Sequence, residues 1–264
     1  MAISSVGVVG AGIIGEALIG ALLRSGTSSE SIKVAEKRSE RKSEICQKYG
    51  VTELISIESV DVLLIAVKPQ DFISTVEEWR NVTDALPLIV SFAAGIKTSA
   101  IEKVLGNNVR VIRVMPNTPM TLGRGISAMS LGARASKDDQ EWLSRFLMTT
   151  GEVIVVPEEL QDAVTATSGS GPAYFFAFTE AVVAAAMKLG LSEPDAIILA
   201  KETLIGAALM VEKSGKDLKT LRENVTSPNG TTAAALKKFT ELGLEEVIFE
   251  SMKAARDRSI ELSS

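Results

Sequence analysis

The chain has 264 residues, which is enough for one large domain or two of ordinary size. Hydrophobic residues make up 46% of it and charged residues 23%, close to the average of soluble globular proteins, so neither a disordered nor a fibrous chain is indicated. The net charge of −5 disfavours nucleic acid as a partner, because phosphate binding needs an excess of Lys and Arg.

Two scarce residue types narrow the chemistry. The chain contains no histidine, which excludes Ser-His-Asp and Cys-His catalysis, the usual zinc enzymes and the commonest general acid–base group at neutral pH. Cys46 is the single cysteine, so no intrachain disulfide and no Cys-rich metal site can form. We expect no bound metal and a reducing compartment. An enzyme of this composition must rely mainly on a cofactor, or on Lys, Tyr, Asp, Glu, Ser and Thr.

Short apolar runs alternate with helical patterns from Val6 to Val156. Strands are predicted over residues 6–9, 32–35, 62–67, 88–92, 109–115, 126–131 and 153–156. Most of these runs are continuously apolar, as is typical of strands buried on both faces of a parallel sheet. Helical patterns between the early strands cover residues 14–25 and 40–49. The alternation predicts right-handed βαβ units and an α/β fold with a doubly wound, Rossmann-like sheet.

Neither of the two most apolar stretches has the pattern of a membrane or export segment. The N-terminal stretch has no basic start, is interrupted by glycines and contains Glu16, which argues against a signal peptide. The run over residues 172–187 contains Glu180 and is shorter than the roughly 20 residues that span a bilayer. We therefore expect a cytoplasmic protein without membrane contact.

Beyond Pro157 the pattern becomes helical throughout. Helices are predicted over residues 172–189, 193–214, 231–242 and 244–262. We therefore divide the chain into a dinucleotide-binding domain, 1–160, and a helical dimerisation and substrate-binding domain, 161–264. The first two helices are apolar around most of their circumference and must be buried on most sides. The favoured interpretation is a homodimer, and the alternative is a helical core packed on the sheet domain.

A glycine motif follows the first predicted strand. Gly10-Ala11-Gly12-Ile13-Ile14-Gly15 lies between that strand and the first helix, the context that a dinucleotide site requires. Gly10 permits the turn, Gly12 lets the backbone approach a pyrophosphate at the helix start, and Gly15 lets the helix lie close to the strand. We predict that this loop, Ile13 and Ile14 included, binds the cofactor. A glycine-rich turn without a ligand is the alternative.

Charged residues after the second strand bear on the choice of dinucleotide. Glu36 stands where an acid would bind the adenosine ribose of NAD, whereas Lys37 and Arg38 suit the 2′-phosphate of NADP. We favour NADP as cofactor, with NAD also possible. In the alternative interpretation, the two cations are solvated turn charges without a ligand.

Five further motifs narrow the function. Three of the motifs stand at the ends of predicted strands, at the edge where doubly wound sheets bind ligands. The other two lie in the helical half. The five motifs are Ala66-Val67-Lys68-Pro69, Ser91-Phe92-Ala93-Ala94-Gly95, Arg113-Val114-Met115-Pro116-Asn117-Thr118-Pro119, Ser168-Gly169-Ser170-Gly171-Pro172-Ala173-Tyr174 and Val225-Thr226-Ser227-Pro228-Asn229-Gly230-Thr231-Thr232. This ordered set, which spans essentially the whole chain, resembles the pyrroline-5-carboxylate reductase family.

The resemblance implies a Rossmann-like domain followed by a helical dimerisation domain. It implies reduction of 1-pyrroline-5-carboxylate to L-proline, the last step of proline synthesis, with NADPH or NADH. It also implies a homodimer, with possible assembly of dimers into a decamer. In this family the substrate lies between the nicotinamide of one subunit and helical segments that include those of its partner.

Site residues follow from the same resemblance. Thr232 is implied to hydrogen-bond the ring nitrogen and is the candidate catalytic residue. The implied substrate contacts are Ser170, Ser227, Asn229, Gly230, Thr231 and Thr232, and the implied cofactor contacts besides the glycine loop are Ala66, Val67, Lys68, Pro69, Ala94 and Asn117. Helix capping by Ser227 and Thr231, and a rigid loop around Asn117 without ligand contact, are the alternatives.

The chain departs from the family pattern at two places. Asn229 replaces the first glycine of the usual Ser-Pro-Gly-Gly, a tolerable change because Asn accepts a left-handed backbone better than most residues. The loop at Ser56 offers no Asn for the ribose contact that the family often makes, so a serine makes this contact or it is absent.

Two other functions compete with the reductase. One is a 3-hydroxyacid dehydrogenase of the same two-domain plan, which needs a general base, usually a lysine on the first helix of the second domain. The only lysine of that helix, Lys188, lies at its far end. A non-catalytic nucleotide-binding regulator is the other, and it would bind the cofactor without turnover.

Overall fold

The computed structural model describes residues 3–80, 86–106 and 108–262. Contacts divide the chain into two compact units, which are described separately. The first, the sheet unit, contains the residues up to Ser170 and those from Ala255 onward. The second, the helical unit, contains Gly171 to Ala254.

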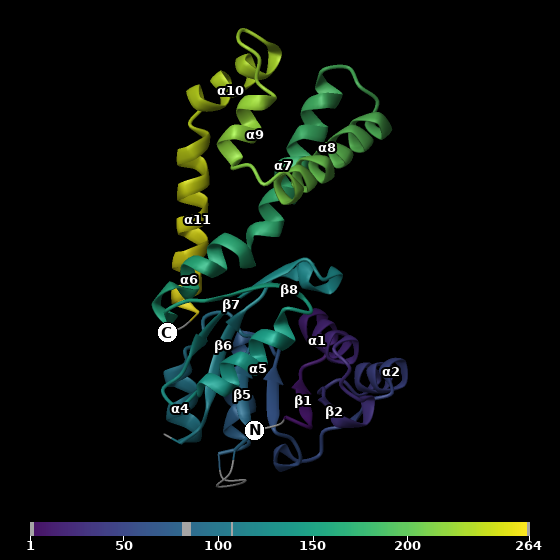
Figure 1. The fold of residues 1–264 in the computed structure, drawn as a ribbon, viewed down its shortest axis with the longest axis vertical. Coiled ribbons are helices and arrows are strands. Elements are labelled where there is room, and N and C mark those ends of the chain that lie inside the picture. The colour runs from purple at the N-terminus through teal and green to yellow at the C-terminus, as the bar shows by residue number, and fades with distance from the viewer. Residues whose placement is uncertain (1–2, 81–85, 107, 263–264) are drawn as a thin grey trace. The chain divides into compact units, whose positions relative to one another are not determined.

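A single eight-stranded sheet forms the centre of the sheet unit (Figure 1). Its strands lie in the order β3-β2-β1-β4-β5-β6-β7-β8. The strands are β1 (Val6–Val9), β2 (Ile32–Ala35), β3 (Thr52–Glu53), β4 (Val62–Ile65), β5 (Leu88–Ser91), β6 (Val111–Met115), β7 (Gly125–Leu131) and β8 (Gly151–Val155). The chain reverses its direction of winding between β1 and β4, which pair in register through Val6 with Val62 and Val9 with Ile65.

The parallel arrangement expected from the apolar runs does not extend to the end of the sheet. Strands β1 to β6 are mutually parallel, but β7 pairs antiparallel with β6, with Met115 opposite Ala128, and β8 then runs parallel to β7. The reversal follows from the short connection after β6, the 3-10 turn Thr118–Leu122, which is too short for the crossover that a parallel neighbour needs. The sequence did not predict the two-residue strand β3 either, because it is too short to show a period.

Helices cover both faces of the sheet, as the doubly wound prediction requires. One apolar cluster joins one face to α1 (Ile13–Arg24), α2 (Ser39–Tyr49) and α5 (Lys137–Leu147), and another joins the opposite face to α3 (Pro69–Glu77) and α4 (Thr98–Leu105). Neighbouring residues of one strand face opposite clusters, as with Leu64 in the first and Leu63 and Ile65 in the second. The strand ends are therefore held rigidly between two packed layers.

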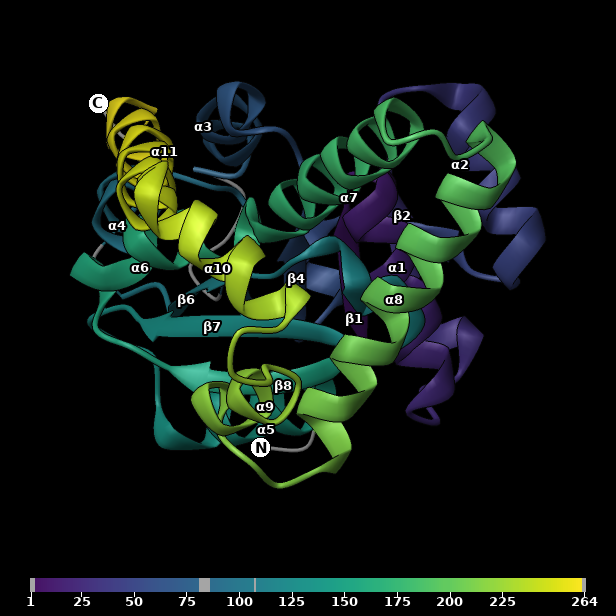
Figure 2. The same ribbon diagram turned by 90° about the horizontal axis from the view of Figure 1, so that it is seen from above.

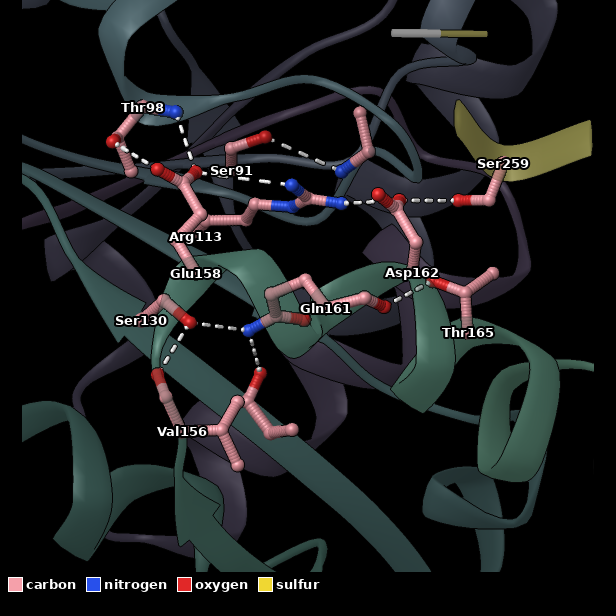
Figure 3. Close-up of polar contacts among 12 residues, drawn as sticks. Ser91, Thr98, Arg113, Ser130, Val156, Glu158, Gln161, Asp162, Thr165 and Ser259 are labelled. Atoms are coloured by element: carbon pink, nitrogen blue, oxygen red, sulfur yellow. Dashed lines mark hydrogen bonds and ion pairs between the residues drawn. The ribbon is translucent and has the colours of Figure 1, made fainter. Parts of the chain in front are cut away.

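A buried arginine links the sheet to the connector after it. Arg113 of β6 is 1% exposed and lies between Glu158 and Asp162, with Nη–Oε1 and Nη–Oδ1 distances of 3.8 and 3.5 Å (Figure 3). Glu158 accepts hydrogen bonds from the backbone N–H and the hydroxyl of Thr98, each 2.7 Å long, and Asp162 accepts one from Ser259 at 2.8 Å. A buried guanidinium needs such partners, since its desolvation is otherwise uncompensated.

This network explains why the sheet unit extends further than the sequence suggested. The 3-10 turn Glu158–Leu160, α6 (Gln161–Val164) and the π-helical turn Thr165–Gly169 all belong to the sheet unit, together with the end of α11 (Leu244–Glu261). The predicted boundary between residues 160 and 161 differs from the division in the structure, after Ser170. Ion pairs between residues distant in sequence leave no periodic pattern, so the sequence could not show this attachment.

The helical unit consists of helices alone among its described residues, as predicted. They are α7 (Gly171–Lys188), α8 (Glu193–Lys213), α9 (Leu218–Asn224), α10 (Thr231–Glu241) and the first part of α11. Helices α7 and α8 pack against each other (Figures 1 and 2). Among the described residues, no helix combines the length and the apolar character that crossing a membrane requires.

Candidate active site

A cleft of about 730 Å³ opens at the carboxyl ends of β1, β2 and β4. This is the switch point of the sheet, where doubly wound folds bind their ligands. The predicted cofactor residues that line it are Gly10, Gly12, Glu36, Lys37, Arg38, Ala66, Val67 and Lys68. Six others lie outside this lining: Ile13, Ile14, Gly15, Pro69, Ala94 and Asn117.

The three glycines of the loop differ in what surrounds them. Gly10 has φ +88°, and a Cβ there would meet the Ala66 carbonyl oxygen at 2.9 Å. A Cβ on Gly15 would lie 1.8 Å from the Gly10 carbonyl oxygen, so only glycine lets α1 start this close to β1. A Cβ on Gly12 would meet nothing within 4 Å. The loop therefore leaves space at Gly12, beside the first turn of α1.

The first turn of α1 has backbone N–H groups that could bind a ligand. Gly12 is the N-cap of α1 and no side chain caps the helix, so the first N–H groups are available to an external acceptor. An uncapped helix start with open space beside it fits an anionic diphosphate. The residues present therefore fit the phosphates of a dinucleotide, with Gly12, Ile13 and Ile14 as the residues that would hold them.

Glu36 contacts the glycine loop itself. Its Oε2 accepts a hydrogen bond from the N–H of Ala11 at 2.9 Å, and its Oε1 accepts from the backbone N–H and Nε of Arg38, both at 3.1 Å. Burial opposes the ionisation of Glu36, but these donors outweigh it and hold the pKa below the ordinary 4.5. Glu36 is thus a carboxylate at neutral pH, with its charge compensated by Arg38.

Lys37 and Arg38, which are predicted to bind the 2′-phosphate, both line the cleft and are exposed. The Arg38 side chain is 68% exposed and binds Glu36 through Nε, which leaves the two terminal nitrogens of its guanidinium for another acceptor. The expected conflict between one carboxylate and two cations is thereby reduced, because the acid is an anchor for the arginine.

The cleft lining also includes Lys68 and Ser56, together with residues that the sequence did not indicate. Lys68 is the N-cap residue of α3 with Pro69 at its first position, as the Ala-Val-Lys-Pro motif suggests. Ser56 lines the cleft, and its Oγ accepts from the N–H of Glu58 at 3.3 Å. Ile55 and Trp79 also line it. Apolar residues isolated in irregular segments carry no periodic signal, so these two were missed.

Asn117 has an identified partner within its own loop. Its Oδ1 accepts a hydrogen bond from the N–H of Ile126 at 2.9 Å, which ties the end of β6 to the start of β7. This contact supports the rigid-loop interpretation, while the side-chain NH₂ group is still able to donate. Ala94 lies half-buried in the turn after β5.

Ser170 follows a π-helical turn. Its N–H donates to the carbonyl of Thr165 at 2.8 Å, and the widened turn Thr165–Gly169 precedes α7 directly. Such turns are rare and are often found at functional sites. The Ser-Gly-Ser-Gly motif indicated this place but not this geometry.

The other predicted substrate residues are close in sequence in the helical unit: Ser227, Asn229 and Gly230 lie in the loop before α10, and Thr231 and Thr232 are the first two residues of that helix. Asn229 has φ 59°, the left-handed conformation expected for it, and no other described residue besides glycines has a positive φ. Gly230 is the N-cap, its N–H donates to the Ser227 carbonyl at 3.0 Å, and no side chain caps the helix. The capping roles considered for Ser227 and Thr231 are therefore wrong. The first N–H groups of α10 are available to an anion, as at α1.

No group of three or more Cys, Asp or Glu side chains that could hold a metal ion occurs among the described residues. The fold and the cleft define the class of protein: a Rossmann-type dinucleotide-binding domain followed by a helical domain, the plan of many nicotinamide-dependent oxidoreductases.

Comparison with known proteins identifies the family. Residues 158–262 match the family model for pyrroline-5-carboxylate reductase dimerisation, and residues 5–95 match that for NADP oxidoreductase, coenzyme F420-dependent. Curated pyrroline-5-carboxylate reductases of Corynebacterium melassecola and Pseudomonas aeruginosa are each 37% identical, over 98% and 97% of this chain and 98% and 95% of their own. The chain therefore belongs to the pyrroline-5-carboxylate reductase family.

Solved structures agree with this assignment. The pyrroline-5-carboxylate reductase of Coxiella burnetii superposes with a TM-score of 0.91 at 32% identity, covering 99% of both chains. The pyrroline carboxylate reductase of Plasmodium falciparum, whose structure has NADP bound, gives 0.84 at 25% identity over 98% of both chains.

Proposed function

We propose that this chain reduces 1-pyrroline-5-carboxylate to L-proline with NADPH, and that it also accepts NADH. The observation that carries the proposal is the cleft at the switch point, with an uncapped helix start and open space at Gly12. Family membership specifies the substrate, and it favours this function over the hydroxyacid dehydrogenase and the regulator.

Residues of the sheet unit have the chemistry to hold the dinucleotide. The first turn of α1 binds the diphosphate through its N–H groups, and Arg38 with Lys37 attracts a 2′-phosphate when one is present. Ala66, Val67 and Lys68 line the cleft. Pro69 and Ala94 are further cofactor contacts, and Asn117 lies near the nicotinamide. When bound, the reduced dinucleotide supplies a hydride to the C=N carbon of the substrate.

Residues of the loop before α10 and of its first turn, with Ser170, hold the substrate. The N–H groups at the start of α10, with Ser227, Asn229 and Gly230, bind the substrate carboxylate, since an uncapped helix start attracts an anion. Thr231 adds a hydroxyl donor. Thr232 hydrogen-bonds the ring nitrogen and holds its proton. A cyclic imine is basic enough to be partly protonated near neutral pH, so its reduction needs orientation more than a strong side-chain acid, and a chain without histidine can perform it.

The assembly and the location follow the same resemblance. We propose a homodimer, and a decamer built from dimers, with its helical unit as the dimerising part, in agreement with the dimerisation model that matches residues 158–262. Exposed apolar side chains of α7 and α8 support it. We place the reaction in the cytoplasm.

Oxidation of NADPH and of NADH by the purified protein, with 1-pyrroline-5-carboxylate as substrate, tests the function. Turnover is expected with both, with the higher kcat/KM for NADPH.

Thr232→Ala should lower kcat/KM by a factor that corresponds to about 1–3 kcal/mol, the value of a buried hydrogen bond. Thr240→Ala, which changes an exposed threonine at the other end of α10, is the matched control and should leave kcat/KM unchanged. Absence of turnover with both dinucleotides would refute the function, and an unchanged Thr232→Ala would remove that residue from the site.

A further inference from the structure

Both backbone polar groups of Ala11, in the middle of the glycine loop, are bound by side chains. The N–H donates to Glu36 at 2.9 Å, and the carbonyl oxygen accepts from Nε of Arg41 at 3.0 Å. Ala11 itself is fully buried. Glu36 therefore holds the peptide group before Ala11 and Arg41 the one after it, immediately before the uncapped turn of α1.

Arg41 uses all three of its nitrogens in this region. Beside the Nε bond to Ala11, Nη1 binds Glu44 at 2.7 Å and Nη2 binds Glu16. The Arg41 side chain is 19% exposed. A planar guanidinium that is engaged on three sides cannot rotate without breaking a hydrogen bond, so it fixes the position of the Ala11 carbonyl.

Glu16 makes this arrangement necessary, because it is an acid in the first turn of α1, at the helix end that attracts anions. It accepts hydrogen bonds from Lys48 at 2.8 Å and from the Tyr49 hydroxyl at 2.9 Å, in addition to Arg41. The Lys48 bond does most to lower the pKa of Glu16 to about 2, against burial and together with Arg41 and Tyr49. A carboxylate here would repel a diphosphate unless cations compensate it.

We propose that Arg41 is a positioning residue for the diphosphate of the dinucleotide. It holds the Ala11 carbonyl so that the first turn of α1 keeps its N–H groups free for the phosphates, and it offsets the charge of Glu16. Arg41 does not line the cleft, so it acts through the loop and not by contact with the ligand. The proposal rests on the dinucleotide-binding part of the proposed function.

Lys48 provides a matched control, because it shares Glu16 with Arg41 but has no contact with Ala11. Removal of either cation leaves Glu16 less compensated. Only removal of Arg41 releases the loop carbonyl. If loop geometry matters, Arg41→Met and Lys48→Met differ in diphosphate affinity although each deletes one positive charge.

The experiment measures the affinity of the intact protein for two fragments by calorimetry or competition. ADP carries the diphosphate, and adenosine 2′-monophosphate carries a phosphate that would reach Lys37 and Arg38. Arg41→Met should weaken ADP about tenfold, the effect of disturbing a set of charge-assisted hydrogen bonds, and change the affinity for adenosine 2′-monophosphate less than about twofold. Lys48→Met leaves Glu16 less compensated but keeps the Ala11 carbonyl bound, so it should weaken ADP by no more than about threefold and change the affinity for adenosine 2′-monophosphate less than about twofold.

Arg41→Lys serves if Arg41→Met does not fold. A lysine keeps the charge but cannot bind Ala11, Glu16 and Glu44 at once, so ADP should again be weakened selectively. Equal losses of ADP affinity in the Arg41 and Lys48 variants, or equal losses for the two fragments, would overturn the proposal, as would unchanged ADP binding. If the parent protein binds ADP but does not turn over 1-pyrroline-5-carboxylate, the reductase function fails and this inference stands on the binding data alone.

Discussion

Gly12 and Gly15 belong to one motif, but their surroundings differ. A Cβ at position 12 would meet nothing within 4 Å and its backbone is extended, whereas a Cβ at position 15 would lie 1.8 Å from a backbone oxygen. Gly12→Ala should therefore fold with a stability within about 0.5 kcal/mol of the parent and bind NADPH at least about tenfold more weakly, since the new methyl occupies the space at the helix start. Gly15→Ala should lower the free energy of unfolding by about 1–3 kcal/mol or more.

Urea unfolding and NADPH titration of both variants separate the two roles. A Gly12→Ala protein that binds NADPH as tightly as the parent would show that the diphosphate does not approach this backbone. A Gly15→Ala protein of unchanged stability would contradict the close packing of α1 on β1.

Residue types and spacing were enough to propose cofactor contacts, and eight of the proposed residues line one cleft, because glycine and charge have local causes that a sequence displays. They did not reveal what Glu36 binds. The ribose contact inferred from its spacing stays a prediction, and the structure adds contacts of the carboxylate with Ala11 and Arg38. Nor did they reveal Arg41, whose partner Ala11 lies 30 positions earlier in the chain. Contacts of this kind depend on how β1 and β2 lie side by side, which periodicity does not encode.

The packing of α1 against α2 carries a pH dependence through Glu16. The folded protein holds the pKa of this acid at about 2, chiefly through Lys48, while the unfolded chain has the ordinary 4.5. The lowered pKa stabilises the fold above pH 4.5, and this stabilisation is lost as the pH falls towards about 2. Glu16→Gln should therefore lower the free energy of unfolding at pH 7, by at most about 3 kcal/mol, and the difference from the parent should shrink below pH 4.5.

Denaturant unfolding at pH 7, 5 and 3 would measure this difference. Glu44→Gln removes another partner of Arg41, but that carboxylate is 58% exposed, so its effect should stay small at each pH. A Glu16→Gln difference that stayed constant from pH 7 to pH 3 would show that the ionisation of Glu16 does not stabilise the fold.

The strands and the long helices were largely predictable, because burial on both faces and helical periodicity leave strong patterns. Direction was not. The run that became β7 was predicted as a strand in the same way as the parallel strands before it, yet it pairs antiparallel with β6. An apolar run shows that a strand is buried but not which way it runs, and the turn Thr118–Leu122 decides that. Helix α9 (Leu218–Asn224) was missed because seven residues are too few to display a period.

Exposed apolar side chains on the helical unit bear on the assembly of the chain. Helices α7 and α8 pack on each other, yet Phe175, Phe176 and Ile198 are 62%, 63% and 56% exposed in the single chain. Exposed aromatic and aliphatic side chains in this density mark a surface that another protein covers, and the match of residues 158–262 to a dimerisation model indicates a second copy of this chain.

Light scattering coupled to size exclusion should give a mass at least twice the 28.0 kDa of one chain. Phe176→Asp should lower that mass or make the protein insoluble, because a charge buried in an apolar interface is costly. Met148→Asp, at an exposed apolar residue of the sheet unit, should leave the mass unchanged. A monodisperse mass of one chain at micromolar concentration would mean that the helical unit buries its apolar faces without a partner.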